Sequence, residues 1–293
     1  MLTALILTNS QISLYYALNG LKLWFSKMIP SLLPFMMISG IMIRLHLTEG
    51  FASLLYPILY PVFHVSKNAC YAMIMGFLCG FPMGAKAVSD LYGQNLLKKR
   101  EAEYLLAFCN NIGPVYFVSF VLPLLHRRLI LPYLFGMYGI PLLYGLFLRY
   151  SFYRELSSVR SVVSACEHKE ALLYEIDEAV SGAVQSILSL GGYMILFNLL
   201  NLIPHVLTNQ PSVLLAPIFE ITGGIDMLKH RLPLYSLLVL PFGGFSCIAQ
   251  TYSCLKHTDL SILKYTMHKL VLTLLTVCYY LLWLWISPSS FMR

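Results

Sequence analysis

Charged residues are scarce in this sequence. Asp, Glu, Lys and Arg make up 11% of its 293 residues, whereas hydrophobic residues make up 58%. A soluble domain carries charge on about a quarter of its residues, so a chain this apolar cannot cover its surface with polar groups. Together with a mean hydropathy of +0.71, this composition excludes an ordinary soluble domain and predicts a protein whose solvent is lipid.

Motifs for catalysis and for metal binding are also missing. The sequence has no P-loop and no HExxH, and Ser246 lies in GGFSC, which is not a nucleophile elbow. Its seven cysteines form no CxxC pair, and six of them lie in apolar runs. They indicate small buried side chains, not a disulfide framework or a metal site. We therefore expect no enzyme activity, no cofactor and no metal.

Long apolar runs dominate what is present. A helix needs about 20 apolar residues to cross the hydrocarbon core, and most runs reach that length. Strands of a membrane barrel would alternate apolar and polar residues, which these runs do not. The sequence therefore predicts an all-α polytopic membrane protein with about eight hydrophobic segments, some of them broken or re-entrant. The segments are 28–47, 70–92, 104–125, 129–150, 179–204, 212–228, 232–254 and 270–287.

Polar stretches divide the chain. Residues 1–27 lack a cleavable signal and predict an amphipathic interfacial N-terminus. The most polar stretch, 151–178, predicts a solvent-exposed helical loop that connects a first membrane half, 28–150, to a second half, 179–293.

The net charge is +7, and the basic residues lie mostly at segment ends, where they anchor to lipid headgroups. We therefore expect the lipid bilayer as a partner and no nucleic acid. The sequence leaves open whether the protein forms a homo-oligomer. These basic residues are Lys22, Lys27, Lys98, Lys99, Arg100, Arg127, Arg128, Lys229 and Arg231.

Two glycine-rich stretches share a pattern. Residues 80–91 read GFPMGAKAVSDL and residues 244–255 read GFSCIAQTYSCL, with five identical positions and with Lys86 aligned to Gln250. Both interrupt long apolar runs. The pattern predicts an internal two-fold repeat, and corresponding broken segments in two halves indicate a transporter's binding site.

Backbone breaks are predicted where glycine and proline cluster within these runs. Proline removes a backbone donor and glycine relaxes the chain, so the helix is expected to unwind. Unwound backbone survives in a membrane only when it is buried in protein or lines a watery cavity. The alternative is a tight helix crossing through small residues. The predicted breaks lie at Gly80, Pro82, Gly84, Gly223, Gly224, Gly243 and Gly244.

Polar side chains near these breaks are the candidate substrate-binding residues. Lys86 would attract an anionic group, although it can also snorkel to the interface. Glu220 would pair with Lys86, couple to a proton or bind a polar group, or it would cap free backbone donors. Asn110 and Asn111 offer uncharged donors and acceptors, or fix helix packing. Gln250 and Ser246 belong to the second-half counterpart.

Five motifs in order make the chain resemble the Gate-domain, or nucleoside-recognition, membrane proteins, and within them a sporulation branch. The resemblance implies a multi-pass protein of the bacterial cell membrane, with the outer forespore membrane as one site. It also implies a role in sporulation, with dipicolinate moving toward the forespore. The motifs are GLKLWFSKMIPSLLPF (20–35), GFPMGAKAVSDLY (80–92), NNIGPVYF (110–117), FEITGG (219–224) and PFGGFSCIAQ (241–250).

These observations favour a transporter or channel for a small polar or anionic organic solute of the dipicolinate type. Free helix N-termini, amide side chains and one lysine suit a small dianion. Two alternatives stay open: a sporulation membrane scaffold or assembly factor that conducts no solute, and a nucleoside-type carrier.

Overall fold

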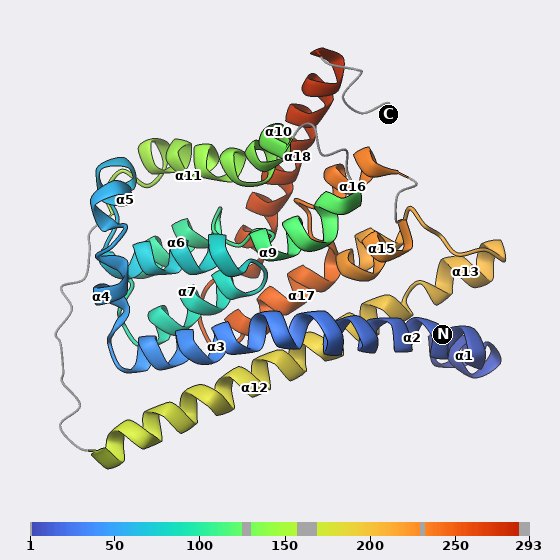
Figure 1. Ribbon diagram of the computed structural model, residues 1–293, viewed down its shortest axis with the longest axis horizontal. Helices are drawn as coiled ribbons and strands as arrows, with labels where there is room; N and C mark the ends of the chain where they lie inside the picture. The colour runs from blue at the N-terminus through green and yellow to red at the C-terminus, as the bar shows by residue number, and fades with distance from the viewer. Residues whose placement is uncertain (1, 125–129, 157–168, 229–231, 287–293) are drawn as a thin grey trace.

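Helices make up the fold. The computed structural model describes residues 2–124, 130–156, 169–228 and 232–286, and these residues contain no strand. Most helices run along the long axis of the molecule, whereas α18 crosses them at a steep angle (Figure 1). The helices α1 and α13 lie at the end that holds the N-terminus, and α4 and α5 lie at the opposite end (Figure 1).

The first part of the chain contains α1 to α11. Short π-helical stretches connect α2 to α3 at Trp24–Met28 and α10 to α11 at Phe135–Gly139. After α9 the chain continues through a π-helical stretch, Phe117–Val121, and a short 3-10 turn, Leu122–Leu124. The helices are α1 Leu2–Thr8, α2 Ser10–Leu23, α3 Ile29–Arg44, α4 Thr48–Ala52, α5 Tyr56–Phe63, α6 Lys67–Cys79, α7 Met83–Gly93, α8 Lys99–Leu106, α9 Pro114–Tyr116, α10 Ile130–Leu134 and α11 Ile140–Ser151.

The second part begins with the 31-residue helix α12, which packs along α2 and α3. Its helices are α12 Lys169–Leu199, α13 Leu202–Thr208, α14 Ala216–Phe219, α15 Ile221–Leu228, α16 Pro233–Val239, α17 Gly244–Leu255 and α18 Ile262–Ile286.

The structure has fewer candidate membrane spans than the sequence has predicted hydrophobic segments, some of which are expected to be broken or re-entrant. Within the described residues, five helical stretches are long and apolar enough, or six if α5 and α6, which meet at 103°, form one span. The prediction of about eight segments is therefore not reproduced, because hydropathy alone cannot separate a span from a buried re-entrant helix. The five stretches are Ser10–Arg44, Ile130–Ser151, Leu172–Thr208, Pro233–Leu255 and Ile262–Ile286.

Residues 70–92 form two packed helices instead of one continuous span. The helices α6 and α7 pack against each other, and a Cβ placed on Gly76 would lie 3.2 Å from Cα of Gly84. The chain therefore forms a helical hairpin whose tip is residues 80–82. Most of its side chains are buried in protein, which explains why its sequence is as apolar as that of a span.

A second, shorter hairpin occupies residues 216–228. The helices α14 and α15 pack side by side, and a Cβ on Gly224 would lie only 2.2 Å from Cα of Pro217. The following segment, Pro233–Leu255, instead continues in one direction through α16 and α17, with an irregular stretch at 240–243. The two glycine-rich stretches thus belong to different kinds of element, a hairpin and a broken span.

The N-terminal helix has no break at the predicted boundary near residue 27. Residues 10–44 form one helix about 52 Å long, which exceeds the ~30 Å hydrocarbon core. The membrane position of residues 1–27 stays a prediction.

Part of the predicted connecting loop is helical, because residues 169–178 begin α12. There Glu175 and Glu178 pair with Arg44 of α3 at 2.9 and 3.3 Å. Of the rest of that loop, residues 157–168 lie outside the described residues, as do Arg127, Arg128, Lys229 and Arg231.

Candidate functional site

The tip of the first hairpin is a backbone break. Gly80 has a φ of +81°, and a cis peptide bond joins Phe81 to Pro82. A Cβ on Gly80 would lie 2.2 Å from the backbone nitrogen of Gly113, so only glycine fits there. Gly84, also predicted as part of the break, lies inside α7, where its missing Cβ leaves room for the carbonyl of Cys109.

The tip meets a second irregular stretch, residues 107–113, which separates α8 from α9. Asn110 is buried within it. Its Oδ1 accepts a hydrogen bond from the backbone of Ala85 at 3.3 Å, and its Nδ2 donates to Thr251 and to Tyr265, both at 3.0 Å. The side chain thus joins α7, α17 and α18. Asn110 therefore fixes the packing of helices, and both polar atoms of its side chain are already bonded within the protein.

Asn111 is also engaged with the protein. Its Nδ2 donates to the carbonyl of Phe108, and the residue lines a small cavity of about 10 Å³ together with Ile112 and Lys269. Neither asparagine therefore lines the larger cavities.

Glu220 lies at the tip of the second hairpin and is 1% exposed. Its Oε1 accepts from the backbone of Thr222 at 3.0 Å. Its Oε2 accepts from the backbone of Gly223 at 2.6 Å and from Nδ2 of Asn198 at 3.1 Å. The carboxylate therefore caps the N-terminus of α15.

The break of the second hairpin lies at Glu220, whose backbone is extended. The predicted break at Gly223 and Gly224 is wrong, because both glycines lie inside α15. Glycine fits at these positions because neighbouring atoms leave little room for a Cβ: one on Gly223 would lie 2.2 Å from Oδ1 of Asn198.

The fourth break, residues 240–243, separates α16 from α17. Gly243 and Gly244 have φ values of +76° and +79°. A Cβ on Gly243 would lie 3.0 Å from the Phe81 ring, and one on Gly244 would lie 3.0 Å from the carbonyl of Pro217. The break therefore touches both hairpin tips. Ser246 is buried in the first turn of α17 and does not line the cavities described next.

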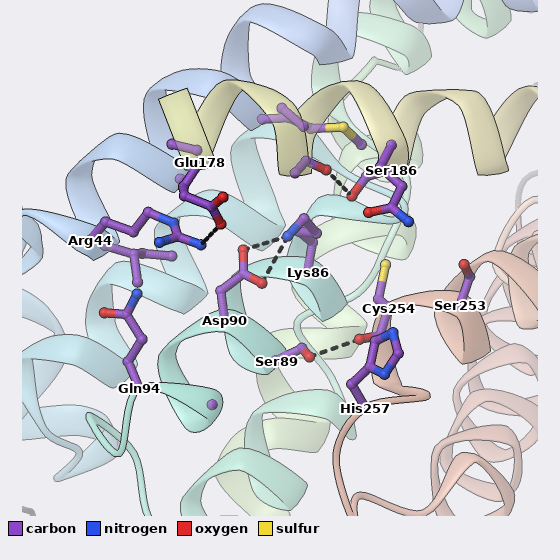
Figure 2. A pocket seen from close by; sticks show the side chains of 18 of the residues that line it. Arg44, Lys86, Ser89, Asp90, Gln94, Glu178, Ser186, Ser253, Cys254 and His257 are labelled. Carbon is purple, nitrogen blue, oxygen red and sulfur yellow. Dashed lines mark hydrogen bonds and ion pairs between the residues drawn. The ribbon is translucent and has the colours of Figure 1, made fainter. Parts of the chain in front are cut away.

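A polar cavity of about 340 Å³ lies between α3, α7, α12 and the C-terminal end of α17 (Figure 2). Lys86 points into it, and its ammonium donates to both carboxylate oxygens of Asp90 at 2.8 and 2.7 Å. Ser89 donates to the carbonyl of Cys254 across the cavity (Figure 2). Arg44 and Glu178 close one side of it (Figure 2).

Two smaller cavities continue from the polar cavity. A connecting cavity of about 30 Å³ shares Ser186, Ser189, Ser253 and Cys254 with it. The same connecting cavity shares Leu190 and Gln250 with an inner cavity of about 70 Å³, which Phe81, Tyr116 and Glu220 also line. The three cavities thus form a row that leads from the polar cavity to the hairpin tips.

The structure does not bring Lys86 and Glu220 together. Lys86 lines the polar cavity and pairs with Asp90, whereas Glu220 lines the inner cavity and caps α15. The predicted site that combines the two is therefore divided between the ends of the cavity row. Gln250, the sequence counterpart of Lys86, lies between them.

The loop after α17 adds an exposed ion pair near the polar cavity. Lys99 and Tyr92 both donate to the carboxylate of Asp259 at 2.7 Å. The hydrogen bond from Lys99, and to a smaller extent that from Tyr92, holds the pKa of Asp259 below its ordinary value. This end of the molecule therefore collects charge of both signs.

Sequence reasoning missed Lys269. This lysine of α18 is 2% exposed, its ammonium donates to the carbonyl of Asn110 at 2.9 Å, and it lies 4.0 Å from the centre of the Phe81 ring. The signal was available, because Tyr265, Lys269, Leu272 and Thr276 follow helical spacing and share the buried face of α18.

Comparisons with known proteins agree with the motif resemblance. Residues 25–123 match the Gate family model, described as nucleoside recognition. The chain is 28% identical to the sporulation integral membrane protein YlbJ of Bacillus subtilis (strain 168), in an alignment that covers 88% of this chain and 74% of the relative. No solved structure matches the chain.

The Gate match contains the first hairpin and the 107–113 break, whereas Glu220 and the 240–243 break follow it in the chain. The resemblance read from the five motifs is confirmed. The chain is therefore a multi-pass membrane protein whose residues 25–123 match the Gate, or nucleoside-recognition, family model, and it is similar over most of its length to YlbJ.

Proposed function

We propose that this protein is a transporter or channel for a small polar or anionic organic solute, and that it acts in sporulation. One observation carries the proposal: the row of three cavities leads from a polar cavity to the point where the hairpin tips meet the break at 240–243. Interrupted backbone in a membrane protein is tolerated where it is buried or lines a watery cavity. A scaffold would have no need of such a row.

The arrangement of the breaks supports two related units. In the first, the tip residue Gly80 lies against Gly113 in the 107–113 break. In the second, the carbonyls of Pro217, Ile218 and Phe219 lie against Gly244 at the 240–243 break. Each unit thus places a hairpin tip on the interruption of the segment that follows it. This is the pattern of transporters built from internal repeats. In this pattern the counterpart of the first hairpin is the second hairpin, whereas the sequence alignment matches Gly80 to Gly244 of the following break.

The charges around the polar cavity favour an anionic solute. Arg44, Lys86 and Lys256 line it, against the carboxylates of Asp90 and Glu178. The connecting cavity is neutral, with serine hydroxyls and the amide of Gln250, whereas Glu220 lines the inner cavity beyond it. Dipicolinate, a small aromatic dianion, is the solute to test first, because the family resemblance implies it and because the relative YlbJ is named for sporulation.

Blocking the row tests the proposal. Ser189 lines both the polar and the connecting cavity, whereas the adjacent Leu188 is 56% exposed on the outer face of α12. In proteoliposomes, we expect Ser189→Trp to abolish most dipicolinate uptake, because the indole fills the passage. Leu188→Trp should transport normally. Equal uptake by the two variants would place the path elsewhere, and no uptake of any solute by the folded wild type would favour a scaffold.

Removing the cation of the polar cavity tests the solute's charge. We expect Lys86→Gln to raise the KM for dipicolinate several-fold with little change in melting temperature, because the partly exposed ion pair between neighbouring turns of α7 contributes little stability. Asp90→Asn is the matched control. It removes the competing carboxylate and should leave the KM unchanged or lower it. A KM unaffected by Lys86→Gln would remove this lysine from the solute path.

A further inference from the structure

Lys269 is a buried lysine that the proposed solute path does not use. Its ammonium lies inside the helical bundle, and its partners are the carbonyl of Asn110 and the face of Phe81. Of the described residues, none offers it a carboxylate within ion-pair distance. A lysine within a membrane segment is costly and usually snorkels to the interface or pairs. Here the protein surrounds the ammonium with uncharged groups instead.

These partners belong to the interrupted segments. Asn110 lies in the 107–113 break, four residues beyond the end of α8, and carbonyls near a helix C-terminus carry partial negative charge. Phe81 forms the tip of the first hairpin and contacts Gly243 in the 240–243 break. An aromatic face also attracts a cation. The ammonium therefore lies where three interrupted segments approach one another.

Carbonyl groups of unwound helices are also what holds the coupling Na⁺ in transporters with broken helices. We infer that the ammonium of Lys269 is a built-in cation, which takes by a covalent tether the place of a bound Na⁺ and holds the interrupted segments together without a metal ion. The stabilising role stands on the contacts alone. Its consequence for transport, uptake that does not require Na⁺, rests on the proposed function.

The geometry around Asn110 explains why a donor or a cation is needed there. The side chain of Asn110 is already bound to α7, α17 and α18, so the position of its carbonyl is set by three helices. Without the ammonium, that carbonyl would be left in a buried site with no donor. Leaving a buried acceptor unpaired is unfavourable, and a small cation or a donor is what restores it.

Chemical rescue of thermal unfolding tests the inference in detergent-purified full-length protein. Lys269→Ala should lower the melting temperature by several degrees. Propylammonium chloride should restore it in a saturable manner, because this ion replaces the lost part of the side chain with its donors. Tetramethylammonium chloride, which has no N–H donor, should not. Lys264→Ala is the matched control, because Lys264 lies on the same helix but is exposed and pairs with Glu103; its melting temperature should not respond to propylammonium.

The wild type supplies the second arm. Its melting temperature should be the same in NaCl, KCl and N-methylglucamine chloride at equal ionic strength. A melting temperature of the wild type that rises in a saturable manner with Na⁺ concentration would overturn the inference. A Lys269→Met protein as stable as the wild type would also overturn it, and so would equal rescue of Lys269→Ala by the two ammonium ions. If Lys269→Ala cannot be purified, the salt dependence of the wild type and the stability of Lys269→Met still test whether Lys269 takes the place of a bound Na⁺.

Dipicolinate uptake is measured separately, with Na⁺ replaced by N-methylglucamine. Unchanged uptake supports the inference, and uptake that requires Na⁺ contradicts it. A complete absence of uptake in every salt counts against the proposed function. In that case the melting temperatures alone test the stabilising role of Lys269.

Discussion

Gly80→Ala is expected to prevent the protein from reaching its native fold. The added Cβ would lie 2.2 Å from the nitrogen and 2.5 Å from the Cα of Gly113, and both are backbone atoms that cannot turn away. The residue also has a φ of +81°, which disfavours alanine. Left-handed backbone and overpacking together cost roughly 2–5 kcal/mol. We expect little monomeric protein in size-exclusion chromatography after membrane extraction, and a melting temperature well below that of the wild type.

Gly192→Ala is the control for this change. Gly192 lies in α12, and a Cβ there would meet nothing within 4 Å, so alanine should be neutral or slightly stabilising. If Gly80→Ala were extracted and melted like Gly192→Ala, the hairpin tip and the 107–113 break would not be in the contact described here. The comparison therefore tests the meeting of the breaks without any knowledge of the solute.

The positions of two breaks could be read from the sequence because their causes are local. Gly80 with Pro82, and Gly243 with Gly244, interrupt helices through their own backbone preferences, and the structure has irregular stretches at both places. Gly223 and Gly224 misled the prediction. Their small size serves close packing against Asn198 and Pro217 inside and beside a helix, and a sequence does not distinguish glycine for packing from glycine for a turn.

The number of crossings could not be read from hydropathy. The helix α6 is as apolar as a span because protein, not lipid, surrounds it: eight of its consecutive residues from Ala69 to Gly76 are buried. Lipid and protein interior select the same side chains. Only the packing of α6 on α7 shows that the chain turns back, and that packing is a tertiary property.

The residues of the site were only partly predictable for a similar reason. Lys86, Glu220 and Gln250 do line the row of cavities, but which cavity each one faces depends on contacts between distant segments. Asp90, four residues after Lys86, was the local partner, and helical spacing alone allows that pair. The role of Lys269 depends on Asn110 and Phe81, which are more than 150 residues away in the chain.

Glu220→Ala should be the most damaging substitution in the second hairpin. It removes the acceptor of three buried donors, namely the backbone nitrogens of Thr222 and Gly223 and the amide of Asn198. Each buried donor left without a partner costs about 1–3 kcal/mol. We expect a large drop in melting temperature. Glu178→Ala is the control, because Glu178 is 44% exposed and pairs with Arg44 at the surface, where an ion pair contributes about 0–1 kcal/mol.

Glu220→Gln separates the stabilising role of this side chain from a role in transport. Glutamine keeps one oxygen for the backbone of Thr222, but its new amide replaces the oxygen that accepts from Gly223 and Asn198. Because one acceptor is kept, the variant should fold better than Glu220→Ala. Because Glu220 lines the inner cavity, a transporter should show altered dipicolinate uptake at normal protein level. A scaffold would keep its sporulation phenotype unchanged in this variant, and that result, together with unaltered flux, would contradict a solute path past Glu220.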